Sequence, residues 1–148
     1  MSTSKTVSAL NDLIEINNDR IEGYKKAMKE TDDSDLKRLF AELSITSEKN
    51  LSELLKQVYG LGGTPEEGTR ATGKLFRAWM DLKAAVTGND KHGILSSCEF
   101  GEDKAQEAYE AALEDESLTP EQRSMVQSQK TALRADHDKV KALRDANA

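Results

Sequence analysis

Four ionisable side chains that lie far apart in the sequence are of the types that could build a metal site: Glu22, Glu99, Glu102 and His137. Carboxylate and imidazole groups are the ligands of di-metal centres inside four-helix bundles. Those centres draw one Glu from each of two helices and a Glu-x-x-His pair from each of the other two. A metal held in this way could support oxidase or iron-handling chemistry.

The ligand pattern of such a centre is incomplete here. The chain has two histidines, His92 and His137, and the residues three positions before them are Asn89 and Arg134 rather than glutamate. We therefore expect no bound cofactor as the first interpretation, with iron or another divalent transition metal as the alternative. Without a metal, Glu99 and Glu102 would be half-buried carboxylates that need partners. The candidate partners are Tyr24, Lys130 and Arg134.

Other reactive groups give no pattern that is typical of catalysis. Cys98, beside Glu99, is most simply a small buried apolar residue, and a reactive thiol is the alternative. The chain contains no nucleophile triad, phosphate-binding glycine loop or His/Cys metal cluster. We therefore predict no catalytic and no cofactor-binding residue.

Composition favours a single domain over residues 1–148 and excludes several partner classes. The 148 residues carry a net charge of −6, and 32% of them are charged, which suits amphipathic helices with a wet outer face. No basic patch stands out, so nucleic acid and anionic membranes are not expected partners. The single cysteine and the lack of an apolar N-terminal segment predict a cytoplasmic protein.

Apolar residues recur at intervals of three and four, which predicts helices and no strand. Asp33 or Ser34 and the Thr119-Pro120-Glu121-Gln122 segment are predicted helix starts, and Gly60 is the expected glycine just after a helix. The apolar face of the first predicted helix includes Ile21 and is interrupted by Asn17. We expect Asn17 to lie in the bundle centre with Asn50. Long helices are predicted over residues 4–30, 35–59, about 90–115 and 120–146, and a short one over 74–86.

Four long helices of similar length predict a bundle, and the connection over residues 60–89 is too long for a tight turn. We expect it to cross the length of the bundle, with Phe76 and Trp79 attaching its short helix. Heights along the bundle axis can be counted from residue 4, the start of the first predicted helix, at 1.5 Å per residue. With a crossover, Glu22 and Glu99 lie at a height of about 27 Å, Glu102 at about 22 Å and His137 at about 25 Å. A simple up-down bundle would leave Glu22 roughly 10 Å from the others. A single site to which all four helices contribute residues therefore requires the crossover.

Several segments resemble an uncharacterised bacterial family of ferritin-like four-helix-bundle proteins that carry a domain of unknown function. The resemblance covers nearly the whole chain and rests on "LNDLIE" at 10–15, "EGY" at 22–24, "GLGGTP" at 60–65, "RAWMDLKAAVTGND" at 77–90, "CEFGED" at 98–103 and "HDKVKALRD" at 137–145. It implies the ferritin-like bundle with a crossover and no established activity. The chain departs from the family pattern at Phe76, where a histidine is common, and at Ala78, where a glycine is common.

Two functions of different classes remain. The first is a non-enzymatic bundle that acts by self-association, most simply as a homodimer, and is made under stress. The second is a di-iron type oxidase or iron-handling protein that uses Glu22, Glu99, Glu102 and His137. The missing Glu-x-x-His pairs favour the first.

Overall fold

The computed structural model describes residues 2–66 and 91–147. In these residues the chain forms four α-helices and no strand, as the apolar periodicity predicts. The short helix predicted over 74–86, with Phe76 and Trp79, lies outside the described residues. The helices are α1 (Ser2–Glu30), α2 (Ser34–Gly60), α4 (Lys91–Leu113) and α5 (Pro120–Ala146).

Two helices begin where the capping signals predict. The Asp33 carboxylate accepts hydrogen bonds from the backbone N–H groups of Asp35 and Leu36, at 2.9 and 3.0 Å, and so caps α2. At the start of α5, the Thr119 hydroxyl accepts from the Gln122 N–H while the Gln122 side chain accepts from the Thr119 N–H. This reciprocal pair satisfies two N–H groups that the first turn of a helix leaves without a partner.

The end of α2 differs from the prediction at Gly60. The helix continues through Gly60, and Gly62 is the residue that takes the left-handed conformation, at φ +74°. The N–H groups of Gly62 and Gly63 bond to the carbonyls of Tyr59 and Val58, both at 3.0 Å. This is a Schellman motif, in which the last carbonyls of the helix gain donors only if the chain reverses at a residue that tolerates positive φ.

The two glycines should therefore respond in opposite ways to alanine. Gly62→Ala places a side chain at positive φ and should lower the free energy of unfolding by about 1–2 kcal/mol. Gly60→Ala is the matched control, because an added Cβ meets nothing within 4 Å at either position and Gly60 lies within the helix. It should raise the free energy of unfolding by about 0.4–1 kcal/mol. Urea unfolding of both variants measures the difference, and equal effects would show that the turn does not need the glycine.

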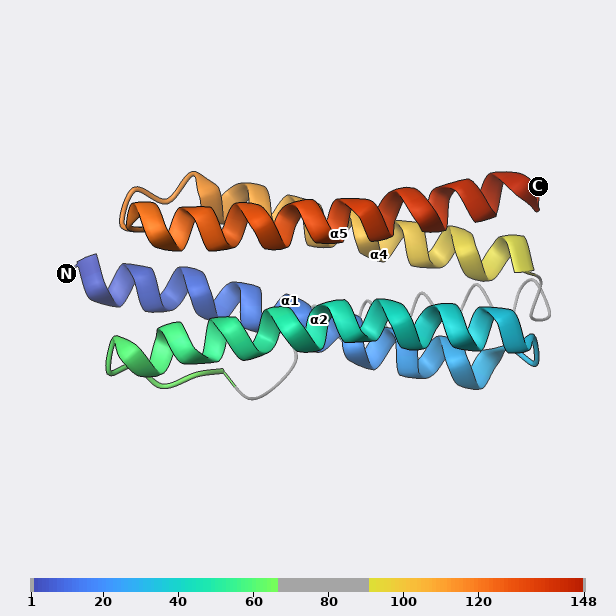
Figure 1. Ribbon diagram of the computed structural model, residues 1–148, viewed down its shortest axis with the longest axis horizontal. Coiled ribbons are helices and arrows are strands. Elements are labelled where there is room, and N and C mark those ends of the chain that lie inside the picture. Colours follow the sequence, from blue (N-terminus) through green and yellow to red (C-terminus); the bar gives the residue numbers. More distant parts are fainter. Residues whose placement is uncertain (1, 67–90, 148) are drawn as a thin grey trace.

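The directions of the helices follow from side-chain contacts. Positions 17 and 20 of α1 meet positions 109 and 102 of α4, through Asn17–Tyr109 and Arg20–Glu102, so α1 and α4 are antiparallel. The short link Thr31–Asp33 makes α1 and α2 antiparallel too, and α2 therefore runs in the same direction as α4 (Figure 1). The α1–α2 pair lies on one side of the bundle and the α4–α5 pair on the other. Most of the joining segment, residues 67–90, falls outside the described residues, so its predicted crossover path stays a prediction.

The buried interior is divided into two apolar clusters. One cluster surrounds Phe40 and Leu95, and Tyr24 stacks on Phe40 with 5.7 Å between ring centroids. The other surrounds Leu54 and Val126. Between them lies a layer of buried polar side chains, so the middle of the bundle is where a site must be sought. The layer contains Asn17, Arg20, Ser47, Asn50, Glu102, Gln129 and Asp136.

None of the helices in the described residues has an apolar stretch of the length that a membrane crossing needs.

Candidate functional site

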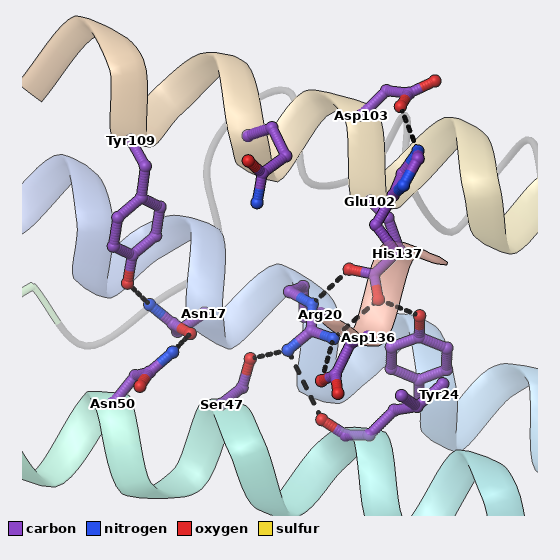
Figure 2. A network of polar contacts seen from close by, with 12 residues as sticks. Asn17, Arg20, Tyr24, Ser47, Asn50, Glu102, Asp103, Tyr109, Asp136 and His137 are labelled. Atoms are coloured by element: carbon purple, nitrogen blue, oxygen red, sulfur yellow. Dashed lines mark hydrogen bonds and ion pairs between the residues drawn. The ribbon is translucent and has the colours of Figure 1, made fainter. Parts of the chain in front are cut away.

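An ion pair between Arg20 and Glu102 occupies the middle of the bundle (Figure 2). Both side chains are fully buried. The guanidinium Nε donates to Glu102 Oε1 at 2.7 Å and Nη2 donates to Oε2 at 2.8 Å. Two parallel charge-assisted hydrogen bonds hold the planes of the two groups together, which is the strongest geometry available to this pair.

The other two bundle helices supply further acceptors for Arg20. Its Nη1 donates to Ser47 Oγ at 2.5 Å and to the Leu43 carbonyl at 3.3 Å, both on α2. Its Nη2 also donates to Asp136 Oδ2 on α5 at 3.2 Å. Glu102 in turn accepts from the Tyr24 hydroxyl at 2.8 Å. One guanidinium therefore binds α1, α2, α4 and α5 together at a single level.

The protonation states of this layer follow from burial and charge. Burial acts to lower the pKa of Arg20, but the neighbouring acidic groups, Glu102 foremost, together outweigh burial, and the pKa lies above its ordinary value. Burial raises the pKa of Asp136, and Arg20 counteracts only part of that rise. Burial, followed by the charge of Glu102, raises the pKa of Tyr24 as well. The phenol therefore stays neutral and the guanidinium stays charged at any physiological pH.

A second polar network lies one turn away along α1. Tyr109 accepts from Asn17 Nδ2 at 2.8 Å and donates to Gln129 Oε1 at 2.7 Å. Gln129 donates to the Asn50 carbonyl and to Glu53, at 3.2 and 3.0 Å. Asn17 and Asn50 are thus in the bundle centre, as predicted, with Asn50 Nδ2 at 3.4 Å from Asn17 Oδ1.

The four residues predicted as metal ligands are distributed over different surroundings. Glu22 is exposed on α1, whereas Glu102 faces Arg20 and Tyr24. His137 is buried on α5, and its Nε2 lies 2.8 Å from Asp103 Oδ1. Glu99 is half-buried beside Arg144. The structure therefore does not bring Glu22 into contact with the others, and it adds Asp103, which the sequence reasoning missed.

Of the partners proposed for Glu102, the structure selects Tyr24. Arg134 instead pairs with Asp138 at 3.2 Å, and the Lys130 carbonyl accepts from Gln106. Arg20 was missed because Ile21 was assigned to the apolar stripe, yet Ile21 is only half-buried and Arg20 is inaccessible to solvent. The available signal was spacing, since position 20 is three residues after Asn17 and four before Tyr24.

Cys98 takes the simpler of its two predicted roles. The side chain is fully buried in the apolar cluster around Phe40. Burial, together with the charge of Glu102, raises the pKa of its thiol well above the ordinary value. Because the thiolate is the reactive form, Cys98 is an inert core residue.

Fold and site together define a four-helix-bundle protein whose centre is closed by a buried arginine–carboxylate network. The sequence model of a family described as a domain of unknown function (DUF2383) matches residues 5–115, which is most of the chain, and the protein belongs to that family. The matched range contains Arg20 and Glu102 and ends before α5, which supplies Asp136 and His137. A search of curated proteins finds no match.

Proposed function

We propose that the protein is a non-enzymatic, single-domain bundle that acts through self-association in the cytoplasm. The observation that carries the proposal is the saturation of its centre. The Glu102 oxygens accept three hydrogen bonds, two from Arg20 and one from Tyr24. A catalytic carboxylate needs a free oxygen and access to substrate, and a buried carboxylate locked to a guanidinium has neither.

Self-association is supported by two exposed apolar side chains on α2. Ile45 is 54% exposed and Tyr59 is 67% exposed. They are 14 residues apart, which is about four helical turns, so they face the same side of α2. A second copy that packed against this side would remove both from water, and Tyr is a common anchor residue in interfaces.

A two-site charge variant tests the self-association. We expect the wild-type protein to be a homodimer and Ile45→Glu/Tyr59→Glu to be monomeric, because the charges would have to be buried without partners. Ala132→Glu, at an exposed position of α5, is the matched control and should leave the dimer intact. Sedimentation equilibrium over a range of concentrations gives the masses. A wild-type protein that stays monomeric at the highest concentration would refute the proposal.

We also propose the ferritin-like arrangement, with a crossover between α2 and α4. It is supported by the shared direction of these two helices, because the end of α2 and the start of α4 then lie at opposite ends of the bundle (Figure 1). We therefore expect the connection between them to travel the length of the bundle.

An oxidase or iron-handling role that uses Glu22, Glu99, Glu102 and His137 is the second candidate. Glu99 and His137 offer ligand atoms near one another, which favours it. The exposure of Glu22 and the pairing of Glu102 with Arg20 weigh against it, because a metal at Glu102 would have to compete with a buried guanidinium.

A further inference from the structure

Three potential metal ligands meet on the surface between α4 and α5. Glu99 and Asp103 are four residues apart on α4, so they share one face of that helix. His137 faces them from α5. One carboxylate oxygen of each acid and one ring nitrogen of His137 all lie within 4.8 Å of one another. A single ion placed among them could contact all three after small side-chain rotations.

The imidazole of His137 is oriented as in metal-binding histidines. Its Nδ1 lies 3.0 Å from Asp138 Oδ1, while Nε2 points the other way, toward Asp103. Asp138 is itself held by Arg134 at 3.2 Å. A carboxylate that accepts the Nδ1 proton fixes the tautomer whose Nε2 lone pair is free to bind a metal.

The third ligand, Glu99, has a partner that can move away. Arg144 Nη1 forms an ion pair with Glu99 Oε2 at a distance of 2.5 Å. The geometry of this pair is not that of a hydrogen bond, and Glu99 Oε2 has no hydrogen-bond partner. Arg144 has a second partner in Asp145, at 2.8 Å from Nη2. An incoming cation could therefore replace Arg144 at Glu99 without leaving the guanidinium unpaired. Asp103 is more than half exposed and gives access from solvent.

We propose that Glu99, Asp103 and His137 form a binding site for a divalent transition metal, with water in the remaining coordination positions. Two carboxylates and a neutral imidazole balance the charge of the ion, and the nitrogen ligand selects ions of the Zn²⁺ and Co²⁺ type over Mg²⁺. The bound ion links α4 to α5. The four ligands predicted from the sequence, called the core set below, are Glu22, Glu99, Glu102 and His137. The proposed site differs from the core set because it uses Asp103 and needs neither Glu22 nor Glu102. It does not depend on self-association.

Titration of the full-length, chelator-treated protein with Co²⁺ tests the site, since the visible spectrum of Co²⁺ reports its ligands. We expect one saturable site that Zn²⁺ competes for and Mg²⁺ does not. Asp103→Asn and His137→Gln should each weaken binding by at least about tenfold, and Asp138→Asn by about 10–100-fold, the usual cost of losing the group that orients a ligating histidine. Arg144→Gln should tighten binding because it removes the competing cation.

Two control variants distinguish this site from the alternatives. Glu107→Gln removes an exposed carboxylate of α4 that pairs with Lys104, and it should leave Co²⁺ affinity unchanged. Glu22→Gln should also have no effect, whereas it would weaken a site built from the core set. Circular dichroism confirms that each variant is folded. The absence of saturable binding, equal affinity in wild type and Asp103→Asn, or weakening by Glu22→Gln would overturn the proposal.

Discussion

Arg20→Met should lower the free energy of unfolding by about 3–5 kcal/mol, the cost of removing one partner from a buried ion pair. The methionine fills much of the space but leaves the fully buried Glu102 carboxylate without its two strongest donors. Asp136 and Ser47 lose their contact with the guanidinium as well. Because domains of this size are stable by only about 5–15 kcal/mol, the variant should sit close to the limit of folding.

Urea unfolding followed by circular dichroism measures this loss. Arg38→Met is the matched control, since Arg38 is 74% exposed and its pair with Asp35 spans 3.9 Å. Surface pairs of this kind contribute little, so the control should unfold at the wild-type urea concentration. The double variant Arg20→Met/Glu102→Leu should recover part of the stability, because the fully buried Glu102 carboxylate is then gone and only Asp136 still faces the methionine. An Arg20→Met protein as stable as wild type would show that the network is not what joins the helices.

The loss caused by Arg20→Met should also depend on pH. Burial already raises the pKa of Asp136 above its ordinary value of 3.8, and the charge of Arg20 is the largest effect that counteracts the rise. Without Arg20 the pKa of Asp136 in the folded state rises further above its value in the unfolded state. The ionised Asp136 carboxylate then lowers the free energy of unfolding at high pH, and protonation of Asp136 removes this loss. The difference from wild type should therefore shrink as the pH falls from about 7 toward about 4.

Tyr109→Phe should lower the free energy of unfolding by about 1–3 kcal/mol, although it removes a single oxygen atom. That oxygen accepts from Asn17 and donates to Gln129 in a fully buried position. The phenylalanine keeps the apolar packing but leaves an amide N–H of Asn17 and the Gln129 carbonyl oxygen without this partner. Buried polar groups that lose a partner cost more than the hydrogen bond itself contributes.

The same substitution at an exposed tyrosine provides the control. Tyr59 is 67% exposed, and Tyr59→Phe should leave the midpoint of thermal unfolding unchanged. Thermal unfolding of both variants under one set of conditions isolates the effect of burial. Equal midpoints would mean that water or a side-chain rearrangement satisfies Asn17 and Gln129 in the variant.

Local signals in the sequence determined the helices and two of their starts. The Asp33 cap and the Thr119–Gln122 capping box depend on residues within one turn of each other, so no knowledge of the rest of the chain is needed to find them. His137 lies four residues after Leu133 and three before Val140, on one face of α5, and all three side chains are buried. The end of α2 was less certain because three glycines lie within four positions, and the hydrogen-bonding pattern selects Gly62.

The partners of the ionisable groups were decided only by the tertiary structure. Hydrophobicity favours Ile21 as the core-facing residue, whereas the helical period favours Arg20. Arg20 can be buried only if a carboxylate on the facing helix pairs with it, and the sequence of α1 does not show whether one is present. Glu102 meets Arg20 and His137 meets Asp103 because of how α1, α4 and α5 are rotated about their axes. Periodicity defines which face of a helix is buried. Which residues of another helix contact that face depends on how helices that are distant in the sequence pack together.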